Sequence, residues 1–340
     1  TIAPMLYAYY HQFDLHPEKV IRGKDNRSGI FFIFWEQSFE RMSGEGVGKN
    51  SSDFFFFFHT FLWVFLPWTV LALIGYWKKI KAFWDAKFAY KPNLEFLTVG
   101  GISILFLLIS FAQFKLPHYM NVLMPLYAIL SAAFLFVLHQ KEKLKMAKII
   151  LGIQYFILIL VVVFTLLVSF YVFKLEHWYS YLFLLMALAL VAYFILKKET
   201  AYAKIVTVAI FSSLLLNGLM NAHFYPKLLE YQGGSTMAQR VKAENIPVDD
   251  IYKINERHTW ALDFYNQNPV NIVSASELKK MKDVWVYATD KELEQLQKKG
   301  IAWNNLITVD QFRITRLQIK FLNPDTREEK LNKMHLVHLN

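Results

Sequence analysis

The sequence contains no cysteine among its 340 residues. Disulfide bonds and zinc sites built from thiolates are therefore excluded, and the composition carries no sign of the redox state of the compartment. Several catalytic signatures are also missing, namely the Walker phosphate loop, the His-Glu-x-x-His zinc motif and the Gly-x-Ser-x-Gly nucleophile elbow. The sequence therefore gives little support to the ATPase, metalloprotease and serine hydrolase classes.

Charged residues are scarce over long stretches of the chain, which leaves six apolar blocks. These blocks are residues 54–77, 94–113, 119–139, 147–173, 180–196 and 203–222. A helix needs about 20 apolar residues to cross the hydrocarbon core of a bilayer, and only helices or closed barrels satisfy the backbone there. The sequence therefore predicts a polytopic α-helical membrane protein with about six transmembrane helices. Pro67, inside the first block, predicts a kink, and the carbonyl that it frees is tolerable when neighbouring helices satisfy it.

The net charge of +10 follows the expected topology rather than a nucleic-acid partner. Twelve lysines lie in alternate connections, whereas the other short connections hold only Lys115 and Lys174. The lysine-rich connections are residues 78–93, 140–148 and 197–204. Cytoplasmic connections carry the excess of Lys and Arg in membrane proteins. We therefore expect these connections in the cytoplasm, and we expect residues 1–53, the 114–118 turn, residues 174–179 and the whole C-terminal segment outside.

These patterns divide the chain into three regions. They are an extracytoplasmic loop with a juxtamembrane amphipathic helix (1–53), a bundle of six spans (54–222) and an extracytoplasmic α/β domain (223–340). The Gly-Gly pair at 233–234 is interpreted as a linker. The chain opens at Thr1 with no signal peptide, and an exported segment needs something to export it. We therefore expect this chain to be the C-terminal part of a longer protein.

The last region has the composition of a soluble domain. Residues 223–340 hold 17 Lys and Arg against 15 Asp and Glu. Runs rich in Val, Ile and Tyr predict strands at DIYKIN, VNIVSA and DVWVYAT. The patterns Ser274-x-x-Glu277 and Thr289-x-x-Glu292 are typical of capping boxes that open helices. Strands that alternate with helices predict a small α/β sandwich with a largely parallel sheet.

The segment GIFFIFWEQSFERMSG, residues 29–44, is dense in aromatic residues on one side and carries Arg41 in its polar later half. Such a segment is typical of a helix that lies in the headgroup plane of a membrane. Its length also fits a buried core helix. Glu36 and Glu40 share one helical face, either as paired carboxylates or as a solvated surface.

The turn FKLPHYMNVLMP, residues 114–125, lies between two apolar blocks. Pro117 prevents a continuous helix and favours an extended residue before it. The turn therefore presents Lys115, His118 and Tyr119 at headgroup depth. An ammonium group there can bind a phosphate, and the imidazole and phenol can donate to the same oxygens. The alternative is that the lysine snorkels and the tyrosine joins the aromatic belt of the membrane.

Other polar groups give weaker indications. His335 and His338 are three residues apart near the end of the chain, with no further metal ligand nearby in the sequence. They are interpreted as ordinary tail histidines, so no metal site is predicted. Asp263, in WALDFY, is expected on a helix of the α/β domain.

At these residues the chain resembles a known family. FKLPHYMNVLMPLYAILSA is similar to the Lys-Leu-Pro-x-Tyr-x-x-Pro-x-x-Pro stretch of bacterial membrane glycosyltransferases with the GT-C fold, relatives of the lipid A aminoarabinose transferase and of protein O-mannosyltransferases. FFIFWEQSFERMSGEG, followed by FFFHTFLWVFLPW, resembles the aromatic juxtamembrane helix of the family and the span after it. The resemblance covers residues 1–222 well, and the last domain by position only.

The resemblance implies a function and a set of site residues. Such enzymes take a sugar from a polyprenyl-phosphate carrier, with inversion, and pass it to a lipid, glycan or protein outside the inner membrane of bacteria. Lys115 and Tyr119 match the motif residues expected near the carrier phosphate, His118 lies between them, and Arg41 matches the juxtamembrane arginine. The family's catalytic carboxylate lies in a first outer loop, so we expect it upstream of Thr1 and expect this fragment alone to be inactive.

One departure concerns a metal. The aminoarabinose enzymes have Glu-His shortly before the arginine, where this chain has Gln37 and Ser38. A divalent metal is therefore unsupported, and no cofactor is expected beyond the polyprenyl-phosphate sugar itself as donor substrate.

Two other functions fit the composition. A transporter or flippase would carry ionisable groups near the bilayer midplane, whereas here polar residues gather at the outer ends of the spans. A non-catalytic scaffold would use the domain at 223–340 to bind a partner, and nothing in that segment excludes it.

Overall fold

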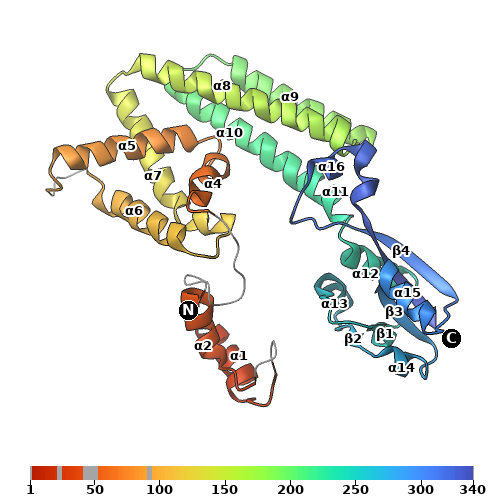
Figure 1. The fold of residues 1–340 in the computed structure, drawn as a ribbon. Coiled ribbons are helices and arrows are strands. Elements are labelled where there is room, and N and C mark those ends of the chain that lie inside the picture. The colour runs from red at the N-terminus through yellow and green to blue at the C-terminus, as the bar shows by residue number, and fades with distance from the viewer. Residues whose placement is uncertain (1, 21–24, 41–52, 90–93, 340) are drawn as a thin grey trace. The chain divides into compact units, whose positions relative to one another are not determined.

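A computed structural model describes residues 2–20, 25–40, 53–89 and 94–339 (Figure 1). The chain forms two compact units. The first comprises Thr1–Leu158 with Ile195–Ser213, and the second Ile159–Phe194 with Leu214–Asn340.

The chain opens with a helical hairpin. Its elements are α1 (Ala3–Tyr9), η1 (Tyr10–Asp14), α2 (Gly29–Phe31) and η2 (Phe32–Glu40). Asp14 at the end of the first arm caps the second arm, because its carboxylate accepts from the backbone N–H of Gly29 at 2.8 Å and from the hydroxyl of Ser28. The predicted helix after residue 28 is therefore confirmed as far as Glu40, and the rest of the predicted segment lies outside the described residues.

The first predicted span is interrupted rather than kinked. It forms α4 (Phe56–Val64) and α5 (Thr69–Asp85), which are separated at Pro67. Gln154 of a later helix is fully buried, and its Nε2 donates to the Pro67 carbonyl at 2.9 Å. The Thr69 hydroxyl donates to the Leu62 carbonyl at 3.2 Å. The carbonyl that Pro67 frees is that of Trp63, which accepts from the backbone N–H of Leu66 at 3.4 Å, so it is satisfied locally, and the neighbouring helix instead satisfies the carbonyl of Pro67.

Five further helical segments follow. They are α6 (Phe96–Phe111), η3 (Pro117–Val122) with α7 (Met124–Gln140), α8 (Leu144–Leu167) with η4 (Val168–Val172), α9 (Trp178–Leu196), and α10 (Ala201–Leu219) with η5 (Met220–Phe224) and α11 (Tyr225–Leu229). Three described stretches are long and apolar enough to cross a membrane, namely Leu144–Val172, Trp178–Leu196 and Ala201–Leu229. Helices α6 and α7 are shorter and also apolar. The expected helical membrane region is therefore confirmed.

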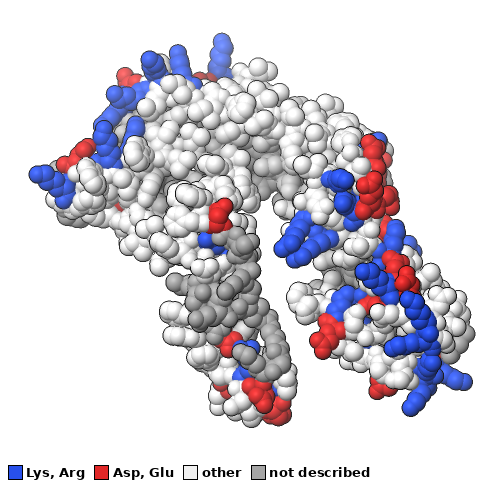
Figure 2. Space-filling model, in the orientation of Figure 1, with Lys and Arg blue, Asp and Glu red and all other residues white. Residues whose placement is uncertain are grey.

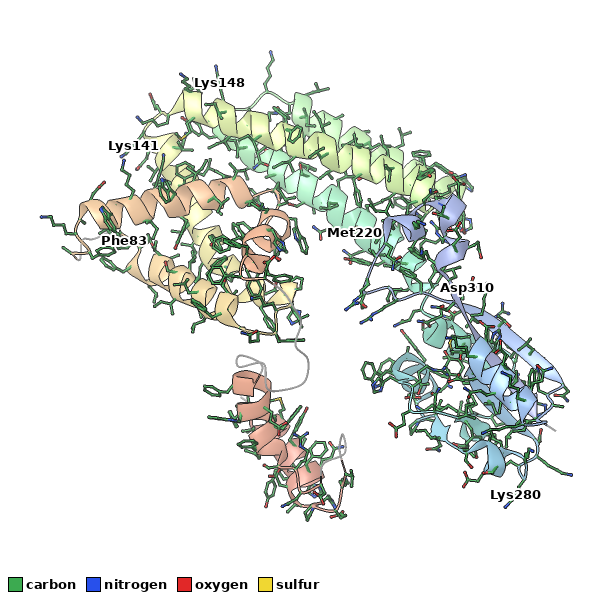
Figure 3. The ribbon with its side chains drawn as sticks, in the orientation of Figure 1. Phe83, Lys141, Lys148, Met220, Lys280 and Asp310 are labelled. Atoms are coloured by element: carbon green, nitrogen blue, oxygen red, sulfur yellow. The ribbon has the colours of Figure 1, made fainter. Side chains whose placement is uncertain are left out.

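Basic side chains gather where helix α7 ends and helix α8 begins. Figure 3 places Lys141 and Lys148 where α7 ends and α8 begins, and Figure 2 shows Lys and Arg side chains concentrated over this region. This is the distribution that the sequence predicted for cytoplasmic connections. The orientation in the membrane itself stays a prediction.

A five-stranded sheet domain ends the chain. Its elements are α12 (Gly233–Ala243), η6 (Val248–Asp250), β1 (Ile251–Lys253), α13 (Trp260–Asn266), β2 (Asn271–Ile272), α14 (Ala275–Leu278), β3 (Val284–Thr289), α15 (Asp290–Lys298), β4 (Asn305–Gln311), α16 (Ile319–Leu322), η7 (Pro324–Thr326), η8 (Glu328–Lys330) and β5 (Asn332–Leu339). The strand order is β2-β1-β3-β5-β4. Strand β1 is parallel to β2 and β3, whereas β5 is antiparallel to β3 and β4. The prediction of a largely parallel sheet is wrong for this second half, because β5 returns between β3 and β4.

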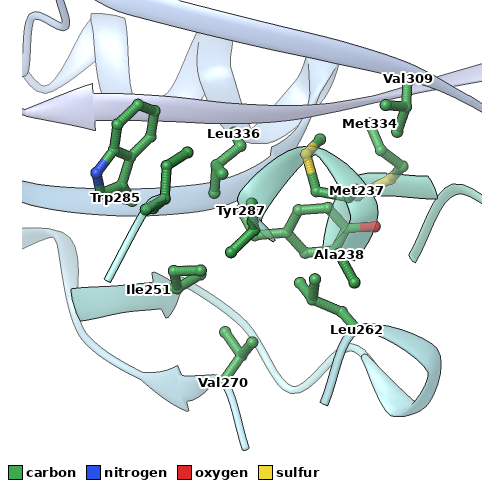
Figure 4. Packing of buried hydrophobic residues seen from close by; sticks show 12 residues of the cluster. Met237, Ala238, Ile251, Leu262, Val270, Trp285, Tyr287, Val309, Met334 and Leu336 are labelled. Carbon is green, nitrogen blue, oxygen red and sulfur yellow. The ribbon is translucent and has the colours of Figure 1, made fainter. Parts of the chain in front are cut away.

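Helices cover both faces of this sheet. Met237 of α12 and Leu262 of α13 lie around the ring of Tyr287 on one face (Figure 4). Leu278 of α14 and Leu296 of α15 pack on the other face. The predicted α/β sandwich is therefore confirmed. Burial in this core raises the pKa of the Tyr287 phenol to about 12.

The interpretation of the Gly-Gly pair as a linker is wrong. Gly233 and Gly234 open helix α12. A Cβ added to Gly233 would lie 2.6 Å from Gln311 Oε1 and 3.1 Å from the Asp310 carbonyl. Gly233 therefore allows α12 to approach strand β4 closely, whereas Gly234 lies against Ala261 and Leu262 of α13, so both glycines are packing requirements.

Glu292 connects helix α15 to the loop after β1. Its buried carboxylate accepts from the Thr289 N–H and from Arg257 Nη1, each at 2.6 Å. The first bond is the one that the glutamate contributes to the predicted capping box, and it is confirmed. Asn255 Nδ2 donates to the second oxygen of the carboxylate. The carboxylate thus compensates a guanidinium that is only one-quarter exposed.

We predict that Glu292→Ala lowers the stability of the sheet domain by about 2 kcal/mol or more, because a part-buried guanidinium and a helix-end N–H lose their partner. Urea-dependent proteolysis of the detergent-solubilised chain measures the change. Glu294→Ala is the matched control, since Glu294 is exposed on the same helix and should change little. Equal stability of the two variants would contradict the assignment.

Arg327 joins the sheet domain to the end of α8 within the second unit. Its guanidinium lies 4.7 Å from the Phe173 ring centre and 5.5 Å from that of Phe321. Its Nε donates to the Phe321 carbonyl at 3.0 Å, and its Nη2 donates to the carbonyl of Val172. Tyr231 adds a third aromatic ring and a hydroxyl acceptor at 3.3 Å. We call these residues the Arg327 clamp.

We expect Arg327→Lys to destabilise this attachment by about 2 kcal/mol, because an ammonium cannot reproduce the planar fork that serves two carbonyls and the stacked rings. The melting temperature of the solubilised chain should fall, and cleavage by trypsin near residue 227 should accelerate. Arg316→Lys is the control, because Arg316 is exposed in the same segment. If both variants melt together, the clamp has no such role.

Candidate functional site

The Lys115 turn connects α6 to α7. Helix α6 ends at Phe111, and Leu116 is extended (φ −132°, ψ 142°) before Pro117 opens the short helix η3. This is the backbone that a following proline favours. The sequence prediction of a tight turn here is confirmed.

The Lys115 side chain is fixed by a hydrogen bond and does not extend into solvent. Its side chain is buried, and its Nζ donates to the Asp53 carbonyl at 2.9 Å. Asp53 directly precedes the segment that forms α4, so this bond fixes the ammonium group beside the start of that helix. A snorkelling lysine would extend into solvent instead.

The other predicted residues differ in exposure. His118 is exposed, whereas Tyr119 is half-buried and packs on the core of the first unit. Their rings meet edge to face at 4.9 Å. The turn therefore carries Lys115, His118 and Tyr119 together. Arg41, the fourth predicted residue, lies outside the described residues, and its approach to Lys115 stays a prediction.

An apolar groove of about 630 Å³ lies among α4, α5, α6 and α7. Phenylalanine rings dominate its walls, and the rings of Phe58 and Phe106 meet at 4.7 Å. Its polar groups are few and include His59 and a hydroxyl pair, Tyr76 with Ser103 at 2.7 Å. The lining residues are Phe55, Phe58, His59, Phe61, Leu62, Leu73, Tyr76, Ile102, Ser103, Phe106, Leu107 and Tyr127.

The groove and the Lys115 turn meet at the start of α4. Phe55 lines the groove and lies two residues after Asp53, whose carbonyl binds Lys115. Phe54, between them, contacts Phe111 at the end of α6, with 5.4 Å between ring centres. An apolar chain in the groove could thus end in an anionic group near the ammonium. The sequence signalled the turn but not the groove, because four separate helices build it.

The remaining candidates from the sequence do not form a site in the described residues. Glu36 pairs with Arg27 at 2.5 Å, and the side chain of Glu40 lies outside the description. His335 and His338 belong to strand β5, so they are not free tail residues. Asp263 lies on α13, as expected.

The two histidines of β5 have separate partners. His335 is buried, with Nε2 2.8 Å from Asp290, whereas His338 Nε2 lies 2.8 Å from Asp283. The odd spacing puts them on opposite faces of the strand. No group of three potential metal ligands occurs in the part of the chain that the structure describes.

Comparison with known proteins adds a fold-level likeness. No protein-family profile matches the chain, and no curated protein matches it. The structure is similar to ArnT from Cupriavidus metallidurans bound to undecaprenyl phosphate, with a TM-score of 0.54 and 13% sequence identity over 99% of this chain. The apo form of the same protein gives a TM-score of 0.53, 12% identity and 91% coverage. The chain spans 58% and 56% of the two solved chains. It therefore has an ArnT-like fold, with apolar helices followed by a mixed sheet domain.

We predict that this groove binds a long apolar chain. Leu107→Trp should obstruct it and weaken binding of a fluorescent isoprenoid phosphate by about tenfold, since several buried methylene groups lose contact. Leu108→Trp is the matched control, because Leu108 is similarly exposed on α6 but does not line the groove. Fluorescence titration in detergent should separate the two variants, and equal affinities would exclude the groove.

Proposed function

We propose that this chain is the membrane-embedded C-terminal portion of a glycosyltransferase that takes a sugar from a polyprenyl-phosphate carrier. The observation that carries the proposal is the buried Lys115 ammonium beside an aromatic groove of apolar helices. A polyprenyl phosphate combines these two chemistries, an isoprenoid chain and an anionic head. The ArnT-like fold supports the same class, since the similar structure holds undecaprenyl phosphate.

The reaction separates charge at the carrier phosphate. The acceptor hydroxyl attacks the anomeric carbon, and the bond from that carbon to the phosphate oxygen breaks with its electron pair. The leaving phosphate gains one negative charge, and the hydroxyl proton passes to a base that we expect outside this chain. Lys115 stabilises the growing charge, with His118 and Tyr119 as additional donors. Arg41 would join them.

The distribution of ionisable groups disfavours a transporter. Residues 96–111 and 178–196 contain no Lys, Arg, Asp, Glu or His, and residues 149–172 contain none either. Transport sites near the bilayer midplane use such groups. Polar chemistry at the helix ends is instead the arrangement that a surface reaction on a lipid-linked sugar needs. The acceptor, whether lipid, glycan or protein, stays open.

The decisive experiment replaces Lys115 in the full-length protein. Lys115→Ala should lower the rate of sugar transfer from a radiolabelled polyprenyl-phosphate donor by about 10²- to 10³-fold, as removal of a single oxyanion donor does. Lys115→Arg should restore part of it. Lys145→Ala, an exposed lysine at the start of α8, is the control and should keep normal turnover.

Because Lys115 is buried, the variants are first compared by melting temperature and by gel filtration. A folded Lys115→Ala variant with near-normal turnover would remove this lysine from the mechanism. A full-length protein with no transfer activity, from any polyprenyl-phosphate sugar, would favour the scaffold instead.

A further inference from the structure

The sheet domain contains its own cleft, of about 690 Å³. Three segments supply most of its walls, namely residues 257–261 after β1, residues 289–291 at the start of α15, and residues 311–315 after β4. Its base includes the buried rings of Tyr287 and Phe312. The volume falls within the range of about 300–1,000 Å³ that is usual for small-molecule sites.

The position of the cleft follows from the sheet topology. Strands β1 and β3 are parallel neighbours. The chain leaves β1 through α13, which packs on one face, and leaves β3 through α15, which packs on the other face. A crevice therefore opens between the carboxyl ends of these two strands. Open α/β sheets bind ligands at this kind of switch point.

The cleft presents positive charge to solvent. Lys291 and Arg313 line it, are exposed, and have no ion-pair partner in the described parts of the chain. Arg257 and Lys333 also line it but are already paired with carboxylates. Asp290 contributes a negative charge to the lining, and its carboxylate lies 2.8 Å from Nε2 of His335. Two unpaired cations at one opening favour an anionic ligand.

An aromatic platform stands beside these cations. Trp260 at the start of α13 is 73% exposed, and the His258 ring stacks on it at 4.4 Å. An indole so exposed contributes little to the core, yet its flat apolar face suits the C–H face of a sugar ring. The side chains of Thr315 and Asn332 add uncharged hydrogen-bonding groups to the lining.

Nucleotides fit the cleft less well. The loop 254–259 after β1 contains no glycine, whereas dinucleotide sites need glycines there so that the backbone can approach the phosphates. The Thr289 N–H at the start of α15 is already occupied by Glu292. Recognition of the anionic group therefore falls to long side chains, which suits a phosphate or carboxylate carried on a sugar.

We propose that this cleft binds an anionic saccharide, with the ring stacked on Trp260 and the anionic group between Lys291 and Arg313. The cleft shares no lining residue with the Lys115 turn, and the inference does not depend on the proposed transferase activity. It gives the sheet domain a recognition role of its own.

Calorimetric titration of the solubilised chain with maltose 1-phosphate tests the site. Lys291→Ala combined with Arg313→Ala should weaken binding by at least about tenfold, the loss expected for a charge-assisted hydrogen bond. Trp260→Ala should weaken it comparably. Lys298→Ala, at the exposed far end of α15, is the control and should bind normally.

The comparison ligands decide the chemistry. Maltose and inorganic phosphate should each bind more weakly than maltose 1-phosphate. Equal binding of inorganic phosphate, tighter binding of ADP, or an unchanged affinity in the double variant would overturn the proposal. Lys115→Ala should leave the titration unchanged, so failure here and failure of the transferase proposal give different results.

A final arm identifies the source of the sugar. The chain is placed in nanodiscs of phosphatidylcholine with or without a phosphorylated glycolipid, and the titration is repeated. Loss of maltose 1-phosphate binding in the second preparation shows that a membrane-anchored headgroup reaches the cleft. Unchanged binding assigns the site to a free saccharide.

Discussion

A helix in hydrocarbon satisfies its own backbone, and ionisable side chains within such a span are rare because it is costly to bury them there. Helix α8 and its η4 continuation span 29 residues, about 43 Å, which exceeds the hydrocarbon thickness of about 30 Å. Its first turns carry Lys145 and Lys148, and at its last residue the Val172 carbonyl accepts from Arg327. Helix α7 likewise begins after the Lys115 turn and ends beside Lys141. The charged residues of these two helices thus lie at their ends, and the orientation of the helices in the membrane stays a prediction.

The burial of Lys115 changes what the residue can do. Two unit charges 4 Å apart attract by about 1 kcal/mol in water but about 4 kcal/mol at an effective dielectric constant of 20. The lysines between α7 and α8 are exposed, and they are screened by water and salt. Lys115 has lost that hydration and keeps a carbonyl oxygen as partner. A phosphate that reaches it would therefore interact more strongly than with a surface lysine.

Local sequence patterns predicted local structure, whereas they did not predict the contacts between residues that are far apart in the sequence. The apolar blocks indicated the helices, and the Val- and Tyr-rich runs indicated β1, β2 and β3. Strands β4 and β5 were missed, because NLITVDQ and NKMHLVHL mix polar with apolar residues and their partners lie elsewhere. The residues of the Lys115 turn were identified, but not the burial of the lysine, since the Asp53 carbonyl lies 62 positions away. The Arg327 clamp spans 155 positions to Val172 and has no motif.

The segment from β4 to β5 serves the cleft and the clamp together. Phe312, at the base of the cleft, stacks on Phe321 with 3.8 Å between ring centres and 7° between planes. Phe321 in turn lies under the Arg327 guanidinium, which binds the end of α8. These contacts connect the cleft to the end of α8, but they do not by themselves couple the two sites energetically. Energetic coupling needs an element with two arrangements that the two sites favour differently. The structure shows one arrangement, in which three aromatic rings surround the guanidinium of Arg327. A ligand in the cleft would then be held at a fixed place relative to the end of α8, and the segment would act by positioning and not by switching.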